Sequence, residues 1–512
     1  MKNHNSAIVL SALSLVSIYS CQEAPVPERM NVLFIPIDDL RPVELACYGG
    51  GAIIAPAMDE LASRGTVFTR AYCQQAVSGP SRASVLTGLR PDQTKVWDLK
   101  TDFRDYLPDA VTLPQYFKES GYTTIGYGKT FHNNLPDTIS WSEKRHIEGF
   151  PFDPDATYVN KENNDIVAKK IERFKERGID RRDQLGIWYV KANSVECEDV
   201  EDDAYYDGVQ TDAAVEALKE LAEAGDPFFL AVGYYRPHLP YNAPKKYWDL
   251  YEREELQLPE NRTPAEGAPE YALGNSYEMR GYDDQSKLPF SYGEQIDDQT
   301  IRELIHGYYA SASYVDAQIG KLIKALDENG LSDNTIIVLW ADHGFKLGEY
   351  NTCCKQSNYE IDTRVPLIVV DPRQKNKGVK QSSLVELVDL YPSVADLAGL
   401  PIPEGLAGES FKAILGDETA IDKEYAYSQF LRGRFGADTK KGVEQMGYAV
   451  RSDNFRYVEW YSWNMGEDTL GKYLTAELYD HRNDPLETIN IADDPQYAEI
   501  VATHHEALAK FL

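Results

Sequence analysis

A serine-containing turn in the first hundred residues has the composition of a catalytic loop. The segment Ser78-Gly79-Pro80-Ser81-Arg82 places two hydroxyl groups, a proline and an arginine within five positions, and Thr87-Gly88 follow it. Its first four fixed positions alone should arise by chance in well under about 1% of chains of this length. The segment also predicts a proline turn followed by a helix from Ser81 to Leu86. Such a turn would place residue 78 at a helix N-terminus, where anions are favoured.

Polar side chains follow four predicted strands, at the point where each strand ends. The predicted strands are 32–37, 122–127, 228–233 and 335–340. In open α/β sheets, ligands bind just beyond the carboxyl ends of the strands, so these side chains should share one edge. In chain order they are Asp38 and Asp39, Lys129 and His132, His238, and Asp342 and His343.

The three aspartates of this group could bind a hard cation together, because calcium and magnesium prefer oxygen ligands. The simpler alternative is that Asp38 and Asp39 cap the turn after their strand, which is the commoner role of such a pair. The acid at a second strand end, Asp342, favours the metal. His343 could complete the metal shell, contact a nucleophile, or be a hydrogen-bonded core histidine.

Lys129 ends a segment, Gly126-Tyr127-Gly128-Lys129-Thr130, that resembles the end of a phosphate-binding loop. The required first glycine falls at Thr123, so that motif fails. A lysine that points into an acidic crevice needs an anionic partner, and the alternative is a solvated surface lysine. His132 and His238 are weak catalytic signals individually, and their shared edge strengthens them.

The alternation of apolar runs with helix-period segments predicts an α/β fold with a large, mostly parallel sheet covered on both faces. A fifth strand is expected over 366–370. Helices are expected from about Thr300 to Glu328, where Asn329-Gly330 is the stop signal, and over Ser383 to Gly399. The Pro, Gly and acid content of residues 254–298 predicts a long loop. After about Ile421 the pattern indicates a small antiparallel subdomain with a hairpin around Ser452-Asp453-Asn454.

Composition excludes several classes of partner. The chain has 512 residues and a formal net charge of −30, which disfavours binding to nucleic acid and to anionic membranes. The N-terminus has a lysine before a short apolar run and predicts an export signal over residues 1–21. Cys21 allows lipoprotein anchoring as an alternative to simple cleavage. No other segment is expected to span a membrane. The remaining cysteines lack metal-site spacing, and the adjacent Cys353 and Cys354 are unexplained.

The turn at residue 78, S-x-P-S-R-x-x-x-x-T-G, resembles the signature of the type I sulfatases. Further segments look like the iduronate 2-sulfatase branch, in order along the chain: NVLFIPIDDLRP, LPQYFKESGYTTIGYGKTFH, PFFLAVGYYRPHLP, ADHGFKLGE, SLVELVDLYP and MGYAVRSDNFRY. The resemblance implies an alkaline-phosphatase-like sulfatase fold. Its catalytic domain would span residues 30–420, and a smaller C-terminal α+β subdomain would span residues 421–512.

The resemblance also implies roles for the polar residues. Residue 78 would be oxidised to formylglycine, whose hydrate attacks sulfur with one hydroxyl and later expels sulfate by deprotonation of the other. Arg82 would steady this hydrate, while Lys129 and Lys355 would bind the sulfate oxygens. His238 would protonate the departing sugar oxygen and His132 would take the hydrate proton, or the reverse. One divalent cation, calcium, would be held by Asp38, Asp39, Ser78, Asp342 and His343.

The signature usually begins with cysteine, so Ser78 implies a bacterial maturation enzyme that oxidises serine. An exported bacterial protein of this kind would act in the periplasm or on a lipid anchor, on a 2-O-sulfated hexuronate of a heparin, heparan or dermatan fragment. Tyr235 stands where relatives often have histidine, which bears on the sugar that is bound. Two alternatives use unmodified Ser78: a phosphatase or phosphonate hydrolase of the same superfamily, and a protein that binds sulfated glycans without catalysis.

Overall fold

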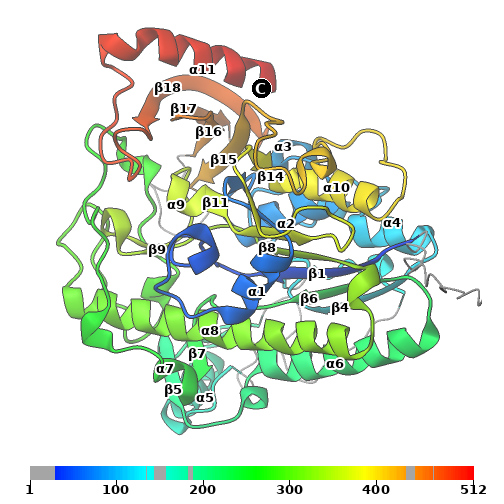
Figure 1. Cartoon of the computed structure of the whole chain (residues 1–512). Helices are drawn as coiled ribbons and strands as arrows, with labels where there is room; N and C mark the ends of the chain where they lie inside the picture. Colours follow the sequence, from blue (N-terminus) through cyan, green and yellow to red (C-terminus); the bar gives the residue numbers. More distant parts are fainter. Residues whose placement is uncertain (1–28, 134, 143–156, 183–187, 434–443, 465) are drawn as a thin grey trace, which may run out of the picture.

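A seven-stranded sheet forms the centre of the computed structural model, which describes residues 29–133, 135–142, 157–182, 188–433, 444–464 and 466–512. The predicted export signal and Cys21 lie outside the described residues. The strand order is β13-β2-β12-β8-β1-β6-β4 (Figure 1). The strands are β1 (Asn31–Ile37), β2 (Thr66–Phe68), β4 (Thr123–Gly128), β6 (Phe228–Gly233), β8 (Thr335–Ala341), β12 (Leu367–Val370) and β13 (Val379–Gln381).

The four neighbours β8, β1, β6 and β4 run parallel, whereas β12 is antiparallel to both of its neighbours. The predicted mixed, mostly parallel sheet is therefore confirmed. All residues of β1 (NVLFIPI) and β8 (TIIVLWA) are buried, as expected of central strands covered on both faces. The four parallel strands β8, β1, β6 and β4 therefore all end at the same edge of the sheet.

Helices cover both faces of this sheet. Figure 1 shows α6 and α8 along one face and α2, α4 and α10 on the other. The described helices are α1 (Pro56–Arg64), α2 (Ser78–Thr87), α3 (Pro91–Thr94), α4 (Leu113–Glu119), α5 (Lys161–Glu176), α6 (Tyr206–Ala224), α7 (Lys245–Trp248), α8 (Asp298–Glu328), α9 (Glu360–Thr363), α10 (Leu390–Leu397) and α11 (Ala498–Phe511). Each helix of the described residues is too short or too polar to cross a bilayer.

The longest helix, α8, confirms the helix predicted to end at Glu328. Asp297 caps it by accepting a hydrogen bond from the backbone N–H of Thr300 at 2.9 Å. Its apolar face is buried against the sheet and against α1 and α6. Gly330 follows in the left-handed conformation that ends the helix.

The predicted helix over Ser383 to Gly399 is wrong in its first half. Val385–Glu386 form strand β14, which pairs in parallel with β3 (Ala71–Tyr72), and α10 begins only at Leu390. Pro392 explains the shift, because proline has no N–H and is tolerated in the first turn of a helix but not in its interior. The buried Glu386 is also held in place by Arg90, at 2.8 Å.

The C-terminal region confirms the predicted antiparallel subdomain and its hairpin. A four-stranded sheet has the order β15-β16-β17-β18 and packs against α11. Its strands are β15 (Ala426–Arg432), β16 (Gln445–Arg451), β17 (Phe455–Asn464) and β18 (Thr469–Asp480). The β16–β17 turn contains Ser452, Asp453 and Asn454, as predicted. The domain boundary at residue 421 stays a prediction.

The segment predicted to be a long loop, residues 254–298, is irregular in the structure. Its named elements are short 3-10 turns, Arg253–Glu255, Glu270–Ala272 and Met279–Gly281. The C-terminal part of this segment is held by the side chain of Asn351, which accepts a hydrogen bond from the backbone N–H of Ile296 and donates one to the carbonyl oxygen of Ser291. Small strand pairs complete the fold: β5 (Val195–Glu198) with β7 (Tyr241–Pro244), β9 (Lys346–Leu347) with β10 (Cys353–Cys354), and β11 (Arg364–Val365) with β3.

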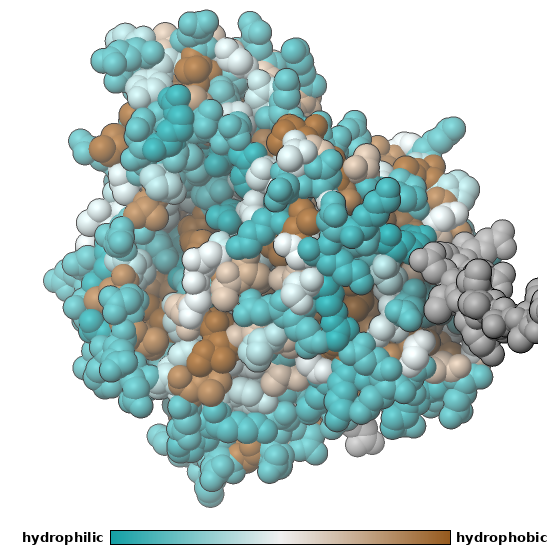
Figure 2. Space-filling view, in the orientation of Figure 1, coloured by the Kyte–Doolittle hydropathy of each residue, from teal (hydrophilic) through white to brown (hydrophobic). Residues whose placement is uncertain are grey.

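The chain carries a formal net charge of −30, and the colouring of Figure 2 shows how polar one face of the molecule is. The face drawn in Figure 2 is mostly hydrophilic, and its hydrophobic residues are scattered among polar ones. An anionic ligand would therefore have to find its positive charge in a local site and not on the general surface.

Candidate active site

The predicted site residues meet beyond the carboxyl ends of four adjacent parallel strands. The order β8-β1-β6-β4 places the residues after each strand side by side. Asp38 and Asp39 follow β1, and Asp342 and His343 follow β8 one strand away. Lys129 follows β4, and His238 lies in the turn after β6. The structure thus brings together the residues that the sequence singled out, and their catalytic roles stay predictions.

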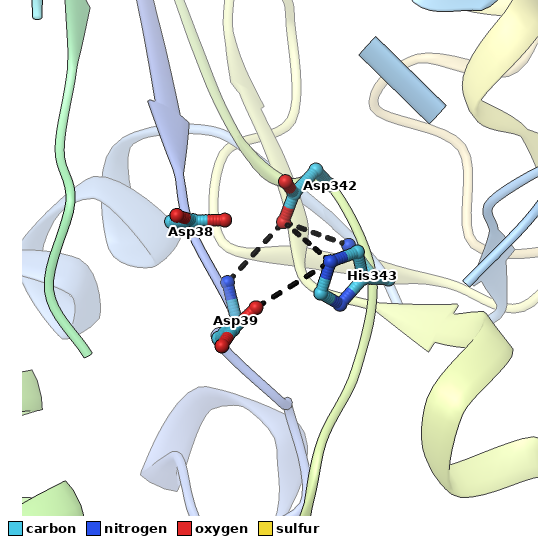
Figure 3. Close-up of side chains that lie close together, drawn as sticks. All are labelled: Asp38, Asp39, Asp342 and His343. Carbon is cyan, nitrogen blue, oxygen red and sulfur yellow. Dashed lines mark hydrogen bonds and ion pairs between the residues drawn. The ribbon is translucent and has the colours of Figure 1, made fainter. Parts of the chain in front are cut away.

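Three carboxylates and one imidazole form a fully buried cluster (Figure 3). Their potential ligand atoms all lie within 4.8 Å of one another. The Nε2 atom of His343 is 3.4 Å from Oδ1 of Asp39 and 3.6 Å from Oδ1 of Asp342. The Nδ1 atom of His343 lies 2.9 Å from the carbonyl oxygen of Gly344, which places its proton there and leaves Nε2 able to bind a metal.

Ser78 is the first residue of α2 and points into this cluster. Its hydroxyl oxygen lies 3.0 Å from Oδ1 of Asp38 and 3.1 Å from Nε2 of His343. The preceding residue, Val77, is extended, so the chain turns into the helix at residue 78 itself. The helix therefore begins three residues earlier than predicted, and the expectation that residue 78 sits at a helix N-terminus is confirmed.

The neighbouring residues of the signature have structural reasons. A Cβ atom at Gly79 would lie 2.5 Å from the carbonyl oxygen of Asp98, so only glycine fits there. Pro80 occupies the first turn of α2, where its missing N–H leaves no bond unmade. The hydroxyl of Ser81 donates to the carbonyl oxygen of Asp342 at 2.5 Å. The signature thus fixes the first turn of α2 against Asp342, the residue that follows β8.

Arg82 and Lys129 bring positive charge to the cluster. The Nε atom of Arg82 donates to Oδ2 of Asp342 at 2.8 Å, and its guanidinium lies 3.7 Å from Asp38. The Nζ atom of Lys129 pairs with Asp38 and lies 3.5 Å from the Ser78 hydroxyl. Both cations are buried, so each side chain is held beside residue 78 in a site with little water.

The two adjacent aspartates have opposite pKa shifts. Burial opposes the ionisation of Asp38, but Lys129, His238 and Arg82 hold the pKa of its carboxyl well below the usual range. Burial raises the pKa of Asp39, although Lys355 lies beside it. Neighbouring carboxylates at such short range favour a further positive charge between them.

Lys355 lies between two carboxylates, and sequence analysis missed one of them. Its Nζ atom is 2.9 Å from Oδ2 of Asp39 and 2.8 Å from Oε2 of Glu278. The other oxygen of Glu278 is 3.0 Å from Nε2 of His238. Burial would lower the pKa of Lys355, but these carboxylates raise it well above its usual value. Glu278 lies in the irregular segment before α8. This segment contains many acidic residues, and nothing in the sequence distinguishes Glu278 from the others.

The segment that presents Lys355 has a strained backbone. Tyr350, Asn351, Cys354 and Gln356 all have positive φ angles, between 52° and 81°. Non-glycine residues rarely adopt this conformation, and such strain gathers at functional sites. Lys355 lies within this strained segment, and its ammonium group points at Asp39 of the cluster.

Cys353 and Cys354 are free and buried, and burial raises the thiol pKa of Cys353 to about 12. Neither thiol therefore has the character of a reactive cysteine. Their place in the short strand β10 indicates a packing role.

His132 follows Lys129 at the end of β4. Burial lowers the pKa of His132 well below its usual range, and the charge of Lys129 adds to this effect. Its Nδ1 atom has no hydrogen-bond partner among the described residues. A neutral imidazole with an open nitrogen can accept a proton.

The cluster of Asp38, Asp39, Asp342 and His343 fits a divalent cation. Three buried carboxylates supply the oxygen ligands that calcium prefers, and the protonation of His343 at Nδ1 directs a lone pair into the same space. Asp39 has a φ of 62°, a conformation that aspartate tolerates better than most residues. These residues would hold the ion, which would neutralise negative charge on a bound ester.

A second group with metal-ligand geometry does not fit a cation. Glu360, His481 and Glu487 lie together, but Arg451 pairs with Glu360 and Arg456 with Glu487. The nitrogens of His481 are taken up by Arg451, at 2.9 Å, and by Glu487, at 2.8 Å. This group is a buried ionic link between α9 and the C-terminal sheet.

Comparison with known proteins gives consistent matches over nearly the whole chain. Residues 30–400 match the family described as Sulfatase, and residues 348–512 match the C-terminal region of N-sulphoglucosamine sulphohydrolase. Human iduronate 2-sulfatase is 32% identical over 96% of each chain. An N-acetylglucosamine-6-O-sulfatase from Bacteroides thetaiotaomicron is 28% identical over 98% of this chain and 89% of its own.

Solved structures share the fold. A 2-O GAG sulfatase superposes with a TM-score of 0.68 and 22% identity, covering 94% of this chain and 92% of its own. A phosphonate monoester hydrolase from Silicibacter pomeroyi has the same TM-score with 24% identity, covering 94% and 95%. The fold is thus common to both enzyme classes, and the sequence matches decide between them. The chain belongs to the sulfatase family, as a type I sulfatase close to iduronate 2-sulfatase, and is a sulfuric ester hydrolase.

Proposed function

We propose that this protein removes the 2-O-sulfate of iduronate, or of another hexuronate, from glycosaminoglycan fragments after Ser78 is oxidised to formylglycine. The observation that carries the proposal is the position of the Ser78 hydroxyl, at the start of α2, within 3.1 Å of both Asp38 and His343. The choice of sugar rests on the 32% identity to human iduronate 2-sulfatase.

Formylglycine would supply, as its hydrate, a nucleophile that serine lacks without an adjacent base. The chain's own residues prepare the surroundings. Lys129 places its ammonium group 3.5 Å from the Ser78 hydroxyl, and Lys355 places a second one beside Asp39 of the same cluster, where both could bind the oxygens of a sulfate ester. Arg82 fixes the carboxylate of Asp342 and thereby the geometry of the metal ligands. A low-dielectric site makes each of these charges more effective than it would be in water.

The contacts of His238 support its assignment as the general acid. Nδ1 of His238 faces the carbonyl oxygen of Leu239 at 2.7 Å, and Nε2 faces the carboxylate of Glu278 at 3.0 Å. Both of these partners are hydrogen-bond acceptors, which orients the ring for proton donation. His132, whose pKa is lowered by burial and by Lys129, is neutral and suits the base.

The proposal includes the protein's location and maturation. The predicted signal over residues 1–21 would direct export, to the periplasm or to a lipid anchor at Cys21, where sulfated glycan fragments are encountered. A serine-oxidising maturation enzyme would have to act on Ser78 while the chain is unfolded, because this side chain is buried in the fold.

The test is a substrate screen with matured, calcium-loaded protein. Mass spectrometry of the peptide with residue 78 first establishes the loss of two hydrogens that marks the aldehyde. Sulfate release from 2-O-sulfated uronate oligosaccharides is the expected result. Release only from 6-O-sulfated hexosamine, or turnover of an aryl phosphate or phosphonate instead, would refute the assignment. Sulfated oligosaccharide binding with residue 78 still serine and no turnover would indicate the non-catalytic alternative.

A further inference from the structure

Glu278 contacts a lysine and a histidine of the site at once. Its Oε1 atom lies 3.0 Å from Nε2 of His238, and its Oε2 atom lies 2.8 Å from Nζ of Lys355. Its side chain is 13% exposed, against 8% for His238 and 3% for Lys355, so it is the most exposed of the three. These are the groups that the proposed function assigns to the sulfate ester.

The carboxylate is an anion in this position. Burial opposes its ionisation, but Lys355 and His238 hold the pKa of Glu278 well below its usual range. Its two oxygens, placed between the Lys355 ammonium and the imidazole ring of His238, resemble two oxygens of a sulfate group. A sulfate ester and Glu278 would therefore compete for the same hydrogen-bond donors.

Neither of these side chains depends on Glu278 alone. Lys355 retains both oxygens of Asp39, at 2.9 and 3.0 Å, and His238 retains the carbonyl oxygen of Leu239. The backbone of Glu278 is held independently, because its carbonyl oxygen accepts a hydrogen bond from Lys191 at 3.2 Å. Rotation of the Glu278 side chain would therefore leave all of these contacts in place.

We propose that Glu278 is an internal counter-anion, which sulfate displaces from His238 and Lys355, and that it thereby sets the affinity of the site for its substrate. The exchange is one anion for another, with no bond made or broken. In the free protein Glu278 occupies Nε2 of His238 as a hydrogen-bond acceptor, and displacement frees this nitrogen for the leaving oxygen. This inference rests on the proposed function only in that the site accepts a sulfate ester.

The test is calorimetric titration with sodium sulfate of calcium-loaded protein that carries unmodified Ser78, at an ionic strength held constant with chloride. Glu278→Gln preserves shape and removes the charge, so we expect it to bind sulfate about tenfold more tightly than the wild type, a change of about 1.4 kcal/mol. Equal or weaker sulfate binding by Glu278→Gln overturns the proposal. That result is expected if the Glu278 carboxylate instead holds His238 and Lys355 in position permanently, because removing its charge would then weaken the site.

Two further variants separate the role of Glu278 from a general change in the charge of its segment. Asp283→Asn removes one charge from the same segment, but Asp283 pairs with Lys170 at the surface, so sulfate affinity should stay unchanged. Equal tightening by Asp283→Asn would show a general field effect and overturn the proposal. Glu278→Asp keeps the charge and should stay near the wild type. No turnover is needed, so a matured enzyme that ignores uronate sulfates would refute the proposed function and leave this result standing.

Discussion

Replacing Lys129 with methionine should make the stability of this protein depend more strongly on calcium. Lys129 is 1% exposed and pairs with Asp38, which is completely buried. Breaking a buried ion pair by removing one partner costs about 3–5 kcal/mol, because the other charge is left uncompensated. Arg82 remains 3.7 Å from Asp38 and softens the loss, so we expect a cost of about 3 kcal/mol without calcium.

Calcium should recover part of this cost. In the wild type, the Lys129 ammonium and a bound cation share Asp38, whereas in Lys129→Met the cation alone neutralises it and should bind more tightly. Calcium stabilises both proteins, so the gap between them closes by about 1.4 kcal/mol for each tenfold tightening of calcium binding in Lys129→Met. The gap between Lys129→Met and wild type should therefore narrow when calcium replaces a chelator. The assay is denaturant unfolding of both proteins under the two conditions.

Lys346→Met is the matched control. Lys346 is 1% exposed and pairs with the buried Asp362, which lies outside the metal-ligand group. Among the residues that the structure describes, Ser357 is then the one side-chain donor to the Asp362 carboxylate, so the cost should approach about 5 kcal/mol. Calcium should not reduce it. A calcium response of equal size in both variants would refute the placement of the cation at Asp38.

Three further predictions concern separate parts of the molecule. Ser78→Ala should abolish sulfate release, while Ser78→Cys should restore it when a cysteine-oxidising maturation enzyme is co-expressed; turnover by Ser78→Ala would contradict the nucleophile assignment. His132→Ala should lower kcat/KM by about a hundredfold, and the wild-type pH profile should keep its activity below pH 6.5 because the pKa of His132 is lowered. Burial raises the pKa of Asp316 to about 7, so the folded state holds this proton more tightly than the unfolded chain does. The protonated carboxyl of Asp316 therefore stabilises the folded state fully below about pH 3.8, and this contribution is lost as the pH rises through about 7. Asn cannot ionise, so the unfolding midpoint of Asp316→Asn should fall less over this pH range than that of the wild type.

The residues after the strands could be predicted because two simple rules agree there. Parallel strands end at one edge, and a polar residue directly after a buried strand must lie at that edge. Asp38, Lys129 and Asp342 were therefore placed correctly without any knowledge of side-chain positions. The position of residue 78 followed from Pro80, since proline belongs in the first turn of a helix.

The contacts made by irregular segments could not be predicted in this way. Glu278 reaches the site from a segment with no periodicity, and nothing local separates it from Asp283, which faces the surface. The helix predicted from Ser383 failed because an apolar pattern was followed across Pro392. The antiparallel direction of β12 depends on how the chain crosses the sheet, which its own residues do not encode.

An acidic protein that acts on an anionic substrate must keep positive charges within its binding site. Here the cations are buried and paired: Lys129 with Asp38, Arg82 with Asp342, and Lys355 with Asp39 and Glu278. The carboxylates of Asp38 and Asp342 are also metal ligands, so a substrate anion cannot replace them in their ion pairs with Lys129 and Arg82. Glu278 alone among these four acids lies outside the metal-ligand group, and its side chain is 13% exposed whereas the other three are completely buried. Substrate entry therefore costs least at Glu278, which makes this residue the point where affinity for sulfate can be tuned without disturbing the metal.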